Sequence, residues 1–87
     1  MKRNEIFKIF KALGNERRFL ILKHILDKKE LTVGQISELI SLSFKSTSRH
    51  LSVLKNANLV ISRQTNLNNF YSLNDECMKD FTKFFKT

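Results

Sequence analysis

Two short helical patterns that almost touch place the strongest constraint on how this chain can fold. The first begins at Thr32, whose hydroxyl is spaced to form a capping box with Gln35, and it ends near Ile40. Leu31, just before the cap, is expected to pack onto the same helix as a hydrophobic staple. Only two residues then precede Ser43, a good N-cap for the next helix. Two helices joined so tightly predict a helix-turn-helix.

The helix that starts after Ser43 has two chemically different faces. Thr47, Leu51 and Leu54 recur at helical spacing and are expected to face inward. The outward positions carry hydroxyl groups and cations: Lys45, Ser46, Ser48, Arg49 and Ser52. No acidic residue occurs anywhere in residues 39–74, although the chain has eight of them. Such a face suits the base edges and phosphates of nucleic acid, whereas a short basic run alone is most often only a solvated surface.

Two further helices are predicted before the helix-turn-helix. The apolar spacing over residues 4–13 is helical, and Asn15 can cap a second helix that ends within residues 27–30. Four residues of that second helix form one apolar stripe, which Leu20 and Ile21 widen: Phe19, Leu22, Ile25 and Leu26.

A β-hairpin and a last helix are predicted after the helix-turn-helix. Aromatic and β-branched residues at 59–61 and 70–73 flank an asparagine-rich centre, as in a hairpin. Asn58 stands where a left-handed residue commonly ends a helix, and Asn74 can cap the last helix. The predicted fold is therefore mainly α with a small β-hairpin wing, a winged helix-turn-helix, in one domain over residues 1–87.

The net charge indicates which kind of molecule this chain binds. Sixteen Lys and Arg against eight Asp and Glu give a formal net charge of +8. The electrostatic partner is therefore expected to be an anion, with nucleic acid first and an anionic membrane surface second. No apolar run of about 18 residues could span a membrane, and no signal-peptide pattern is present. We expect a cytoplasmic protein.

Three segments of the chain carry a resemblance to the ArsR/SmtB family of bacterial winged-helix repressors. Ala12–Arg18 is similar to the family's A-L-[GA]-[ND]-P-T-R stretch. Leu42–Leu54 is similar to its L-S-x-x-x-x-S-R-H-L-x-x-L core, and Ala57–Val60 resembles its A-G-L-[VI] sequence. Two residues differ without harm: Glu16 replaces proline in a first helical turn, and Asn58 replaces glycine but tolerates the left-handed conformation.

The resemblance also implies a homodimer that presents two recognition helices to double-stranded DNA at a pseudo-palindromic operator. Such dimers are joined through the first and last helices. Apolar residues beyond the needs of one small core fit this arrangement: Ile6, Phe7, Phe10, Phe81, Phe84 and Phe85. The alternative is that these side chains simply fill the core of a monomer.

Many family members release DNA when a metal binds, and here the chain departs from the family. The resemblance places the usual thiolate pair at Thr32 and Gly34, which supply no thiolate. The family's other site needs histidine on the last helix, but His24 and His50 are the only histidines and neither lies there. Carboxylates alone make a poor transition-metal site, so we expect no regulatory metal and no cofactor. His24 is expected to be a partly buried helix residue, and His50 a structural residue or a phosphate contact.

Cys77 is the single cysteine, so an intrachain disulfide cannot form. A redox sensor usually pairs a low-pKa thiol with a resolving cysteine, and packing is therefore the expected role of Cys77. Pairing of Cys77 between two subunits remains an open alternative. The sequence contains no catalytic arrangement and no phosphate-binding glycine loop, so nothing supports an enzyme.

The predicted function is sequence-specific DNA binding by a transcriptional regulator that acts as a repressor. Arg49 is the expected guanine reader and Lys55 a flanking contact, while Arg63 and two asparagines bring the wing to the DNA. The full set of expected DNA contacts is Ser43, Lys45, Ser46, Ser48, Arg49, His50, Ser52, Lys55, Arg63, Asn66 and Asn68. The alternative is a protein-interaction module whose phenylalanine-rich faces bind another protein and whose basic charge is incidental.

Overall fold

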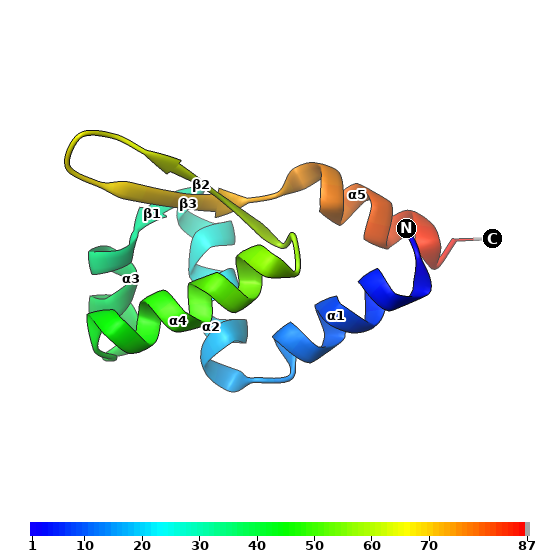
Figure 1. Cartoon of the computed structure of the whole chain (residues 1–87), viewed down its shortest axis with the longest axis horizontal. Helices are drawn as coiled ribbons and strands as arrows, with labels where there is room; N and C mark the ends of the chain where they lie inside the picture. The colour runs from blue at the N-terminus through cyan, green and yellow to red at the C-terminus, as the bar shows by residue number, and fades with distance from the viewer. Residues whose placement is uncertain (87) are drawn as a thin grey trace.

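The computed structural model describes residues 1–86, and in them five helices accompany a small three-stranded sheet (Figure 1). The elements are α1 (Arg3–Leu13), α2 (Glu16–Lys28), β1 (Glu30–Thr32), α3 (Val33–Ile40), α4 (Phe44–Asn56), β2 (Val60–Gln64), β3 (Asn69–Leu73) and α5 (Asp75–Phe84). Figure 1 shows the β2–β3 wing extending at one end and the start of α1 with α5 at the other. This arrangement confirms the predicted winged helix-turn-helix.

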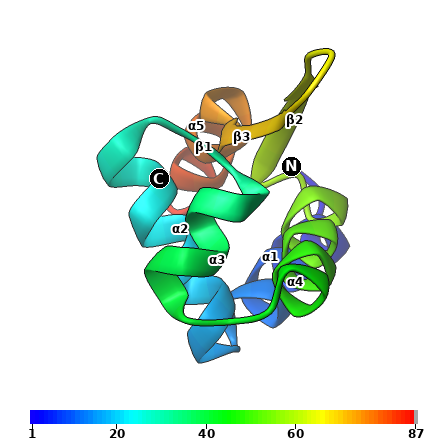
Figure 2. The same cartoon turned by 90° about the vertical axis from the view of Figure 1, so that its left-hand side faces the viewer.

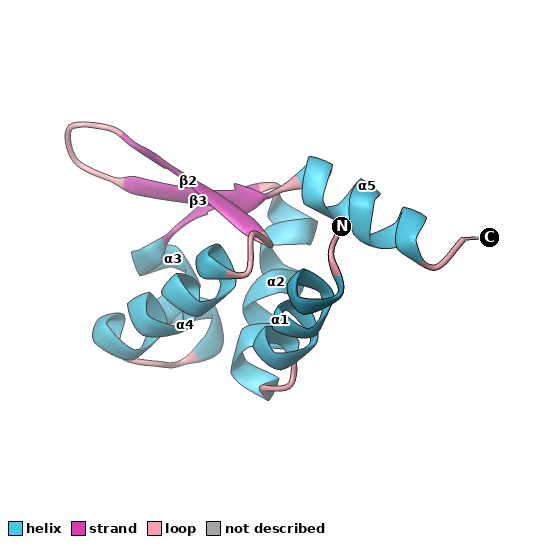
Figure 3. Ribbon diagram, turned by 45° about the vertical axis from the view of Figure 1, so that its right-hand side comes forward, coloured by secondary structure: helices cyan, strands magenta, loops and turns pink. Residues whose placement is uncertain are grey.

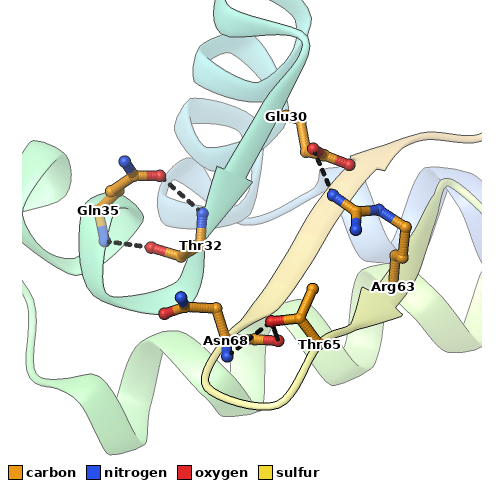
Figure 4. A network of polar contacts seen from close by, with 6 residues as sticks. All are labelled: Glu30, Thr32, Gln35, Arg63, Thr65 and Asn68. Atoms are coloured by element: carbon orange, nitrogen blue, oxygen red, sulfur yellow. Dashed lines mark hydrogen bonds and ion pairs between the residues drawn. The ribbon is translucent and has the colours of Figure 1, made fainter.

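Side-chain caps start the helices where the sequence predicted them. Asn15, Ser43 and Asn74 each accept a hydrogen bond from an amide in the first turn of the following helix. At α3 the capping box is complete: the Gln35 amide donates to Thr32 Oγ1 at 3.2 Å, and the Thr32 amide donates to Gln35 Oε1 at 2.9 Å (Figure 4). These bonds satisfy amides that have no partner inside their helix.

Residues with a positive φ follow three of the helices. Asn58 follows α4 with φ 63°, as predicted, and Ser41 follows α3 with φ 54°. Lys29 ends α2 with φ 73°, which the sequence did not predict because lysine carries no particular preference for this conformation. After α4, the Leu59 amide donates to the carbonyl of Leu54 at 3.0 Å and so satisfies a carbonyl at the helix end.

The sheet is antiparallel with strand order β1-β3-β2, so it contains one strand more than the predicted hairpin. The additional strand, β1, places Leu31 opposite Tyr71. Leu31 is 6% exposed and belongs to the core as a strand residue, a role that the staple interpretation did not include. A strand of three residues is too short to show alternation, so only its pairing with β3 reveals it.

The core lies between the four helices α1 to α4 and the inner face of the sheet. Ile21 and Ile25 of α2 are fully buried there, together with Ile36 of α3. Only part of the predicted apolar stripe of α2 packs inward, because Phe19 is 55% exposed and Leu26 is 64% exposed. Ile25 does pack inward, but the buried face of the helix is rotated toward Ile21. Packing against the neighbouring elements, rather than the width of the apolar arc, sets that rotation.

The wing and α4 lie on the same side of the molecule (Figure 2). α5 leaves β3 beyond the helical body and runs near the start of α1 (Figure 3). The structure therefore separates the α4–wing side from the end where α1 and α5 meet.

Candidate nucleic-acid interface

Hydrogen bonds within the chain engage the polar groups at the start of α4. Ser43 Oγ accepts from the Ser46 amide at 3.1 Å, and the Ser43 carbonyl accepts from Thr47 Oγ1 at 2.8 Å. Thr47 is fully buried, so its hydroxyl needs this partner. The first turn of α4 contains no acidic residue to oppose the positive end of the helix dipole.

An exposed polar stripe runs along α4 from its first to its last turn. Lys45, Arg49, Ser52 and Asn56 recur at helical spacing and are all exposed, with Ser48 and Lys55 along one edge. Within residues 1–86, no ion pair involves Lys45 or Arg49. The sequence reasoning missed Asn56, although its spacing from Ser52 was a usable signal.

Lys55 connects the end of α4 to the wing. Its Nζ donates to Ser62 Oγ of β2 at 2.7 Å, and both groups are on the solvent side. The ammonium group therefore lies where the polar stripe of α4 meets the inner face of the wing. An ammonium group has three donors, so this contact leaves capacity for an anion.

Arg63 is held within the protein. Its Nη2 donates to Glu30 Oε1 at 2.9 Å (Figure 4), and its guanidinium carbon lies 4.8 Å from the centre of the Phe70 ring. Strand alternation places Arg63 and Phe70 on the face of the sheet opposite to buried Tyr71. Arg63 was predicted to contact DNA, and the structure shows that this contact would compete with an acidic partner from β1.

The tip of the wing is closed by a short turn. The Thr65 amide donates to the carbonyl of Asn68 at 2.8 Å, and the Asn68 amide donates to Thr65 Oγ1 at 3.1 Å (Figure 4). The turn presents Asn66, Leu67 and Asn68 to solvent, and Leu67 is 91% exposed. The two predicted asparagines therefore lie together at the end of the wing.

His50 lies on the inner side of α4, away from the polar stripe. Its Nδ1 is 3.3 Å from Arg18 Nη1, and Arg18 Nε donates to the carbonyl of Ala12. Arginine can only donate, so Nδ1 accepts and the neutral ring carries its proton on Nε2. Burial, followed by the charges of Arg18 and Arg17, lowers the pKa of His50 from its ordinary value of 6.5.

This geometry supports the structural role for His50 among the two that the sequence left open. Arg18 joins α4 to the corner between α1 and α2, because it binds the last turn of one helix and a side chain of another. The sequence reasoning assigned no role to Arg18, although it belongs to the Ala12–Arg18 segment that carries the family resemblance.

The remaining reactive side chains do not form a further site in the part of the chain that the structure describes. Cys77 is 8% exposed, and burial, Asp80 and Glu5 all raise the pKa of its thiol, which therefore stays protonated. His24 is half-buried on α2, as expected. Residues 1–86 contain no group of three or more His, Cys, Asp or Glu placed to hold a metal ion. Across the same residues no helix has both the length and the apolar content needed to cross a membrane.

An aromatic cluster occupies the end of the molecule where α1 and α5 meet. The Phe10 ring centre lies 5.6 Å from that of Phe81 and 6.3 Å from that of Phe85, and Phe84 lies 5.5 Å from Phe85. Phe10, Phe84 and Phe85 nevertheless remain 50%, 50% and 58% exposed, and Phe7 is 57% exposed. These phenylalanines therefore do not simply fill the core of one chain.

Ile6 differs from the other residues predicted at the dimer interface. It is only 4% exposed, so its side chain is already covered by its own chain. The wide apolar arc of α1 did not separate residues that face the chain's own core from residues that face outward.

A capped helix-turn-helix, an acid-free outward face on its second helix and an adjacent β-wing define a winged helix-turn-helix DNA-binding protein. Comparison with known proteins agrees: a family model described as "Bacterial regulatory protein, arsR family" matches residues 15–62. The chain belongs to the ArsR family of transcriptional regulators, which confirms the resemblance noted from the sequence. It is a DNA-binding transcriptional regulator.

The relatives of this chain include a transcriptional activator and a transcriptional repressor. The transcriptional activator HlyU of Vibrio cholerae is 39% identical over 71 residues, which are 82% of this chain and 65% of HlyU. The transcriptional repressor SdpR of Bacillus subtilis is 33% identical over 72 residues, which are 83% of this chain and 79% of SdpR. Among solved structures, the homodimeric winged helix-turn-helix DNA-binding domain of Mb0332 from Mycobacterium bovis has a TM-score of 0.79 at 26% identity. That match covers 93% of this chain and 75% of the Mb0332 chain.

Proposed function

We propose that two copies of this chain form a homodimer that represses transcription by binding a pseudo-palindromic operator. The observation that carries the proposal is the exposed stripe of α4, which combines cations, hydroxyls and an amide with a complete absence of acidic residues. Phosphates and base edges in a major groove match these groups.

Different residues of the stripe have different proposed roles. Arg49 is exposed in the middle of α4, where a guanidinium can donate two hydrogen bonds to one guanine. Lys45, Ser48 and Ser52 contact base edges or backbone on either side of it. At the helix N-terminus, phosphate is bound by first-turn amides and Ser46, and at the opposite end by Lys55.

The wing contributes through Asn66 and Asn68, which lie at its tip and reach the neighbouring minor groove or phosphates. Arg63 contributes only when its pair with Glu30 opens. Since the described wing carries no other basic side chain, we expect a smaller share of the affinity from it than from α4.

The dimer is proposed from the exposed phenylalanines of α1 and α5. Four of them are at least half exposed on one chain, and an apolar patch of that kind on a small protein marks an association surface. The homodimeric Mb0332 domain, with the same fold, supports this assignment. A twofold dimer presents its two α4 helices to two half-sites, which requires a pseudo-palindromic operator.

Repression is the proposed direction because a dimer bound across an operator excludes other proteins from the same stretch of DNA. A reporter gene behind the selected operator should rise in expression when the chain is removed. A fall in expression would instead indicate activation, the direction of the transcriptional activator HlyU.

Duplex binding measured at several salt concentrations tests the function directly. A DNA-binding dimer should prefer a selected duplex over a scrambled one, and its affinity for both should fall as salt rises. Equal, weak affinity for all polyanions would contradict sequence-specific binding.

A further inference from the structure

One large apolar side chain stands among polar ones at the start of α4. Phe44 is the first residue of the helix and is 62% exposed. Within residues 1–86 it takes part in none of the aromatic pairs, which all involve phenylalanines of α1 and α5. The proposed polar contacts of α4 assign it no role.

The position of Phe44 separates it from the core and from the proposed dimer surface. Ser43 supplies the cap, and Thr47 supplies the buried contact of the first turn, so the fold does not require an aromatic ring at this position. In Figure 1 α4 begins at the end of the molecule away from α5, and the paired rings of Phe10, Phe81, Phe84 and Phe85 belong to α1 and the α5 region. A second copy docked on α1 and α5 would leave Phe44 uncovered.

Helical spacing places Phe44 beside the polar stripe. Ser48 follows it by one turn and Lys55 by three, so the ring lies on the edge of the surface that carries these two residues. The N-terminal residues of a recognition helix are those that approach base edges. With α4 in the major groove as proposed, an exposed ring at this position faces the base edges.

The only apolar group that base edges present in the major groove is the 5-methyl group of a pyrimidine. Thymine presents its 5-methyl group, and methylated cytosine presents the same group at the same place, whereas the other edges present donors and acceptors. We propose that Phe44 is a specificity-determining residue that packs on the 5-methyl group of a pyrimidine in each half-site. This inference rests on the proposed placement of α4 in the major groove and adds an apolar contact to its polar ones.

Removal of single methyl groups from DNA tests the inference. A high-affinity duplex is first selected from a random pool with the wild-type protein, and each thymine is then replaced by uracil, which lacks only the methyl group. At one thymine of each half-site, a single replacement should weaken wild-type binding about fourfold, the effect of one buried methyl-sized group. The Phe44→Ala variant should be insensitive to the same replacement, and Phe44→Leu should keep part of the sensitivity.

Methylation of single cytosines tests whether the methyl group belongs to 5-methylcytosine rather than to thymine. If the target is methylcytosine, 5-methylcytosine at one position should strengthen wild-type binding about fourfold but leave Phe44→Ala unchanged. Leu26→Ala is a matched control, because it removes a side chain of similar exposure, 64%, from α2. It should keep the wild-type response to both replacements.

Two results would overturn the inference. In the first, Phe44→Ala folds but lowers the affinity for all duplexes alike, and wild-type binding does not respond to any methyl group. That result would place the ring against the sugar–phosphate backbone. A wild-type protein that shows no salt-sensitive duplex binding at all would overturn the proposed function and this assignment with it. The two failures are distinguishable, because only the second abolishes binding by the wild-type protein.

Discussion

Arg18, His50 and Arg63 obtain their roles from contacts with residues far away in the sequence. Arg18 reaches His50 across 32 positions, and Arg63 reaches Glu30 across 33. The contact with Arg18 gives His50 a role in positioning α4. The contact with Glu30 engages the guanidinium group of Arg63 in the wing. By contrast, Arg49 and Lys45 are exposed and make no ion pair within residues 1–86.

Substitution of Arg49 and Lys55 should produce two different kinds of loss. Arg49→Ala should cost about 1–3 kcal/mol per half-site and relax the preference at one base position. Lys55→Ala should weaken all duplexes alike and make the salt slope shallower by about one per subunit. Titration of specific and scrambled duplexes at several salt concentrations separates these outcomes. Unchanged affinity and preference in folded Arg49→Ala would exclude α4 as the reader.

His50 should make stability depend on pH. Its folded-state pKa lies below the unfolded value of 6.5, so folding favours the neutral ring. The stabilisation is complete above pH 6.5 and is lost as pH falls through the folded-state pKa. Tm of the wild-type protein should therefore fall more between pH 7.5 and 5.0 than Tm of His50→Asn, whose amide oxygen accepts near the Nδ1 position without titrating. Parallel curves for the two proteins would contradict this role.

The helices and strands differ in how completely local signals specify them. α3 and α4 have side-chain caps at their starts, and the turn between them contains Ser41 at φ 54°. β1 has no local signal and exists because β3 pairs with it. The turn of the helix-turn-helix lies where the sequence predicted it, but Ser41 is strained. In the left-handed region its Cβ atom lies too close to the following carbonyl oxygen.

Ser41→Gly should relieve that strain. We expect the free energy of unfolding to rise by about 0.5–1 kcal/mol, because glycine adopts the left-handed conformation without steric cost. Glu38→Gly, one turn earlier in the interior of α3, should instead lower it by about 0.5–1 kcal/mol. Urea unfolding of both variants measures the two effects. Equal destabilisation by both would show that the turn is not strained.

The whole molecule places two unlike surfaces at some distance from one another. α4 and the wing lie on one side of the molecule (Figures 1 and 2). Half-exposed phenylalanines gather where α1 and α5 meet. An arrangement of this kind allows one surface to bind DNA while the other joins two copies.

A dimer should be present at micromolar concentration. Sedimentation is expected to give twice the chain mass of 10.3 kDa, because a monomer would leave Phe10, Phe84 and Phe85 half exposed to water. Phe84→Asp should split the dimer into folded monomers, since it adds a charge to that surface. A wild-type monomer under these conditions would refute the interface.

Transition metals should not alter operator binding. The positions that carry thiolates in the family are Thr32 and Gly34 here, and residues 1–86 bring together no three metal-ligating side chains. Low micromolar Zn²⁺ or Ni²⁺ should leave the affinity for the selected duplex unchanged. Stoichiometric metal binding by calorimetry, coupled to release of DNA, would contradict this prediction.

The sequence by itself determined the helix starts, the helix-turn-helix, the hairpin and the acid-free face of α4. All of these depend on residues within a few positions of one another, such as Thr32 with Gln35, or on the helical period. Only the tertiary structure decided the third strand, the rotation of α2 that leaves Phe19 exposed, and the partners of His50 and Arg63. These features depend on packing between segments distant in the chain, and a local pattern contains no information about which distant segment will be the neighbour.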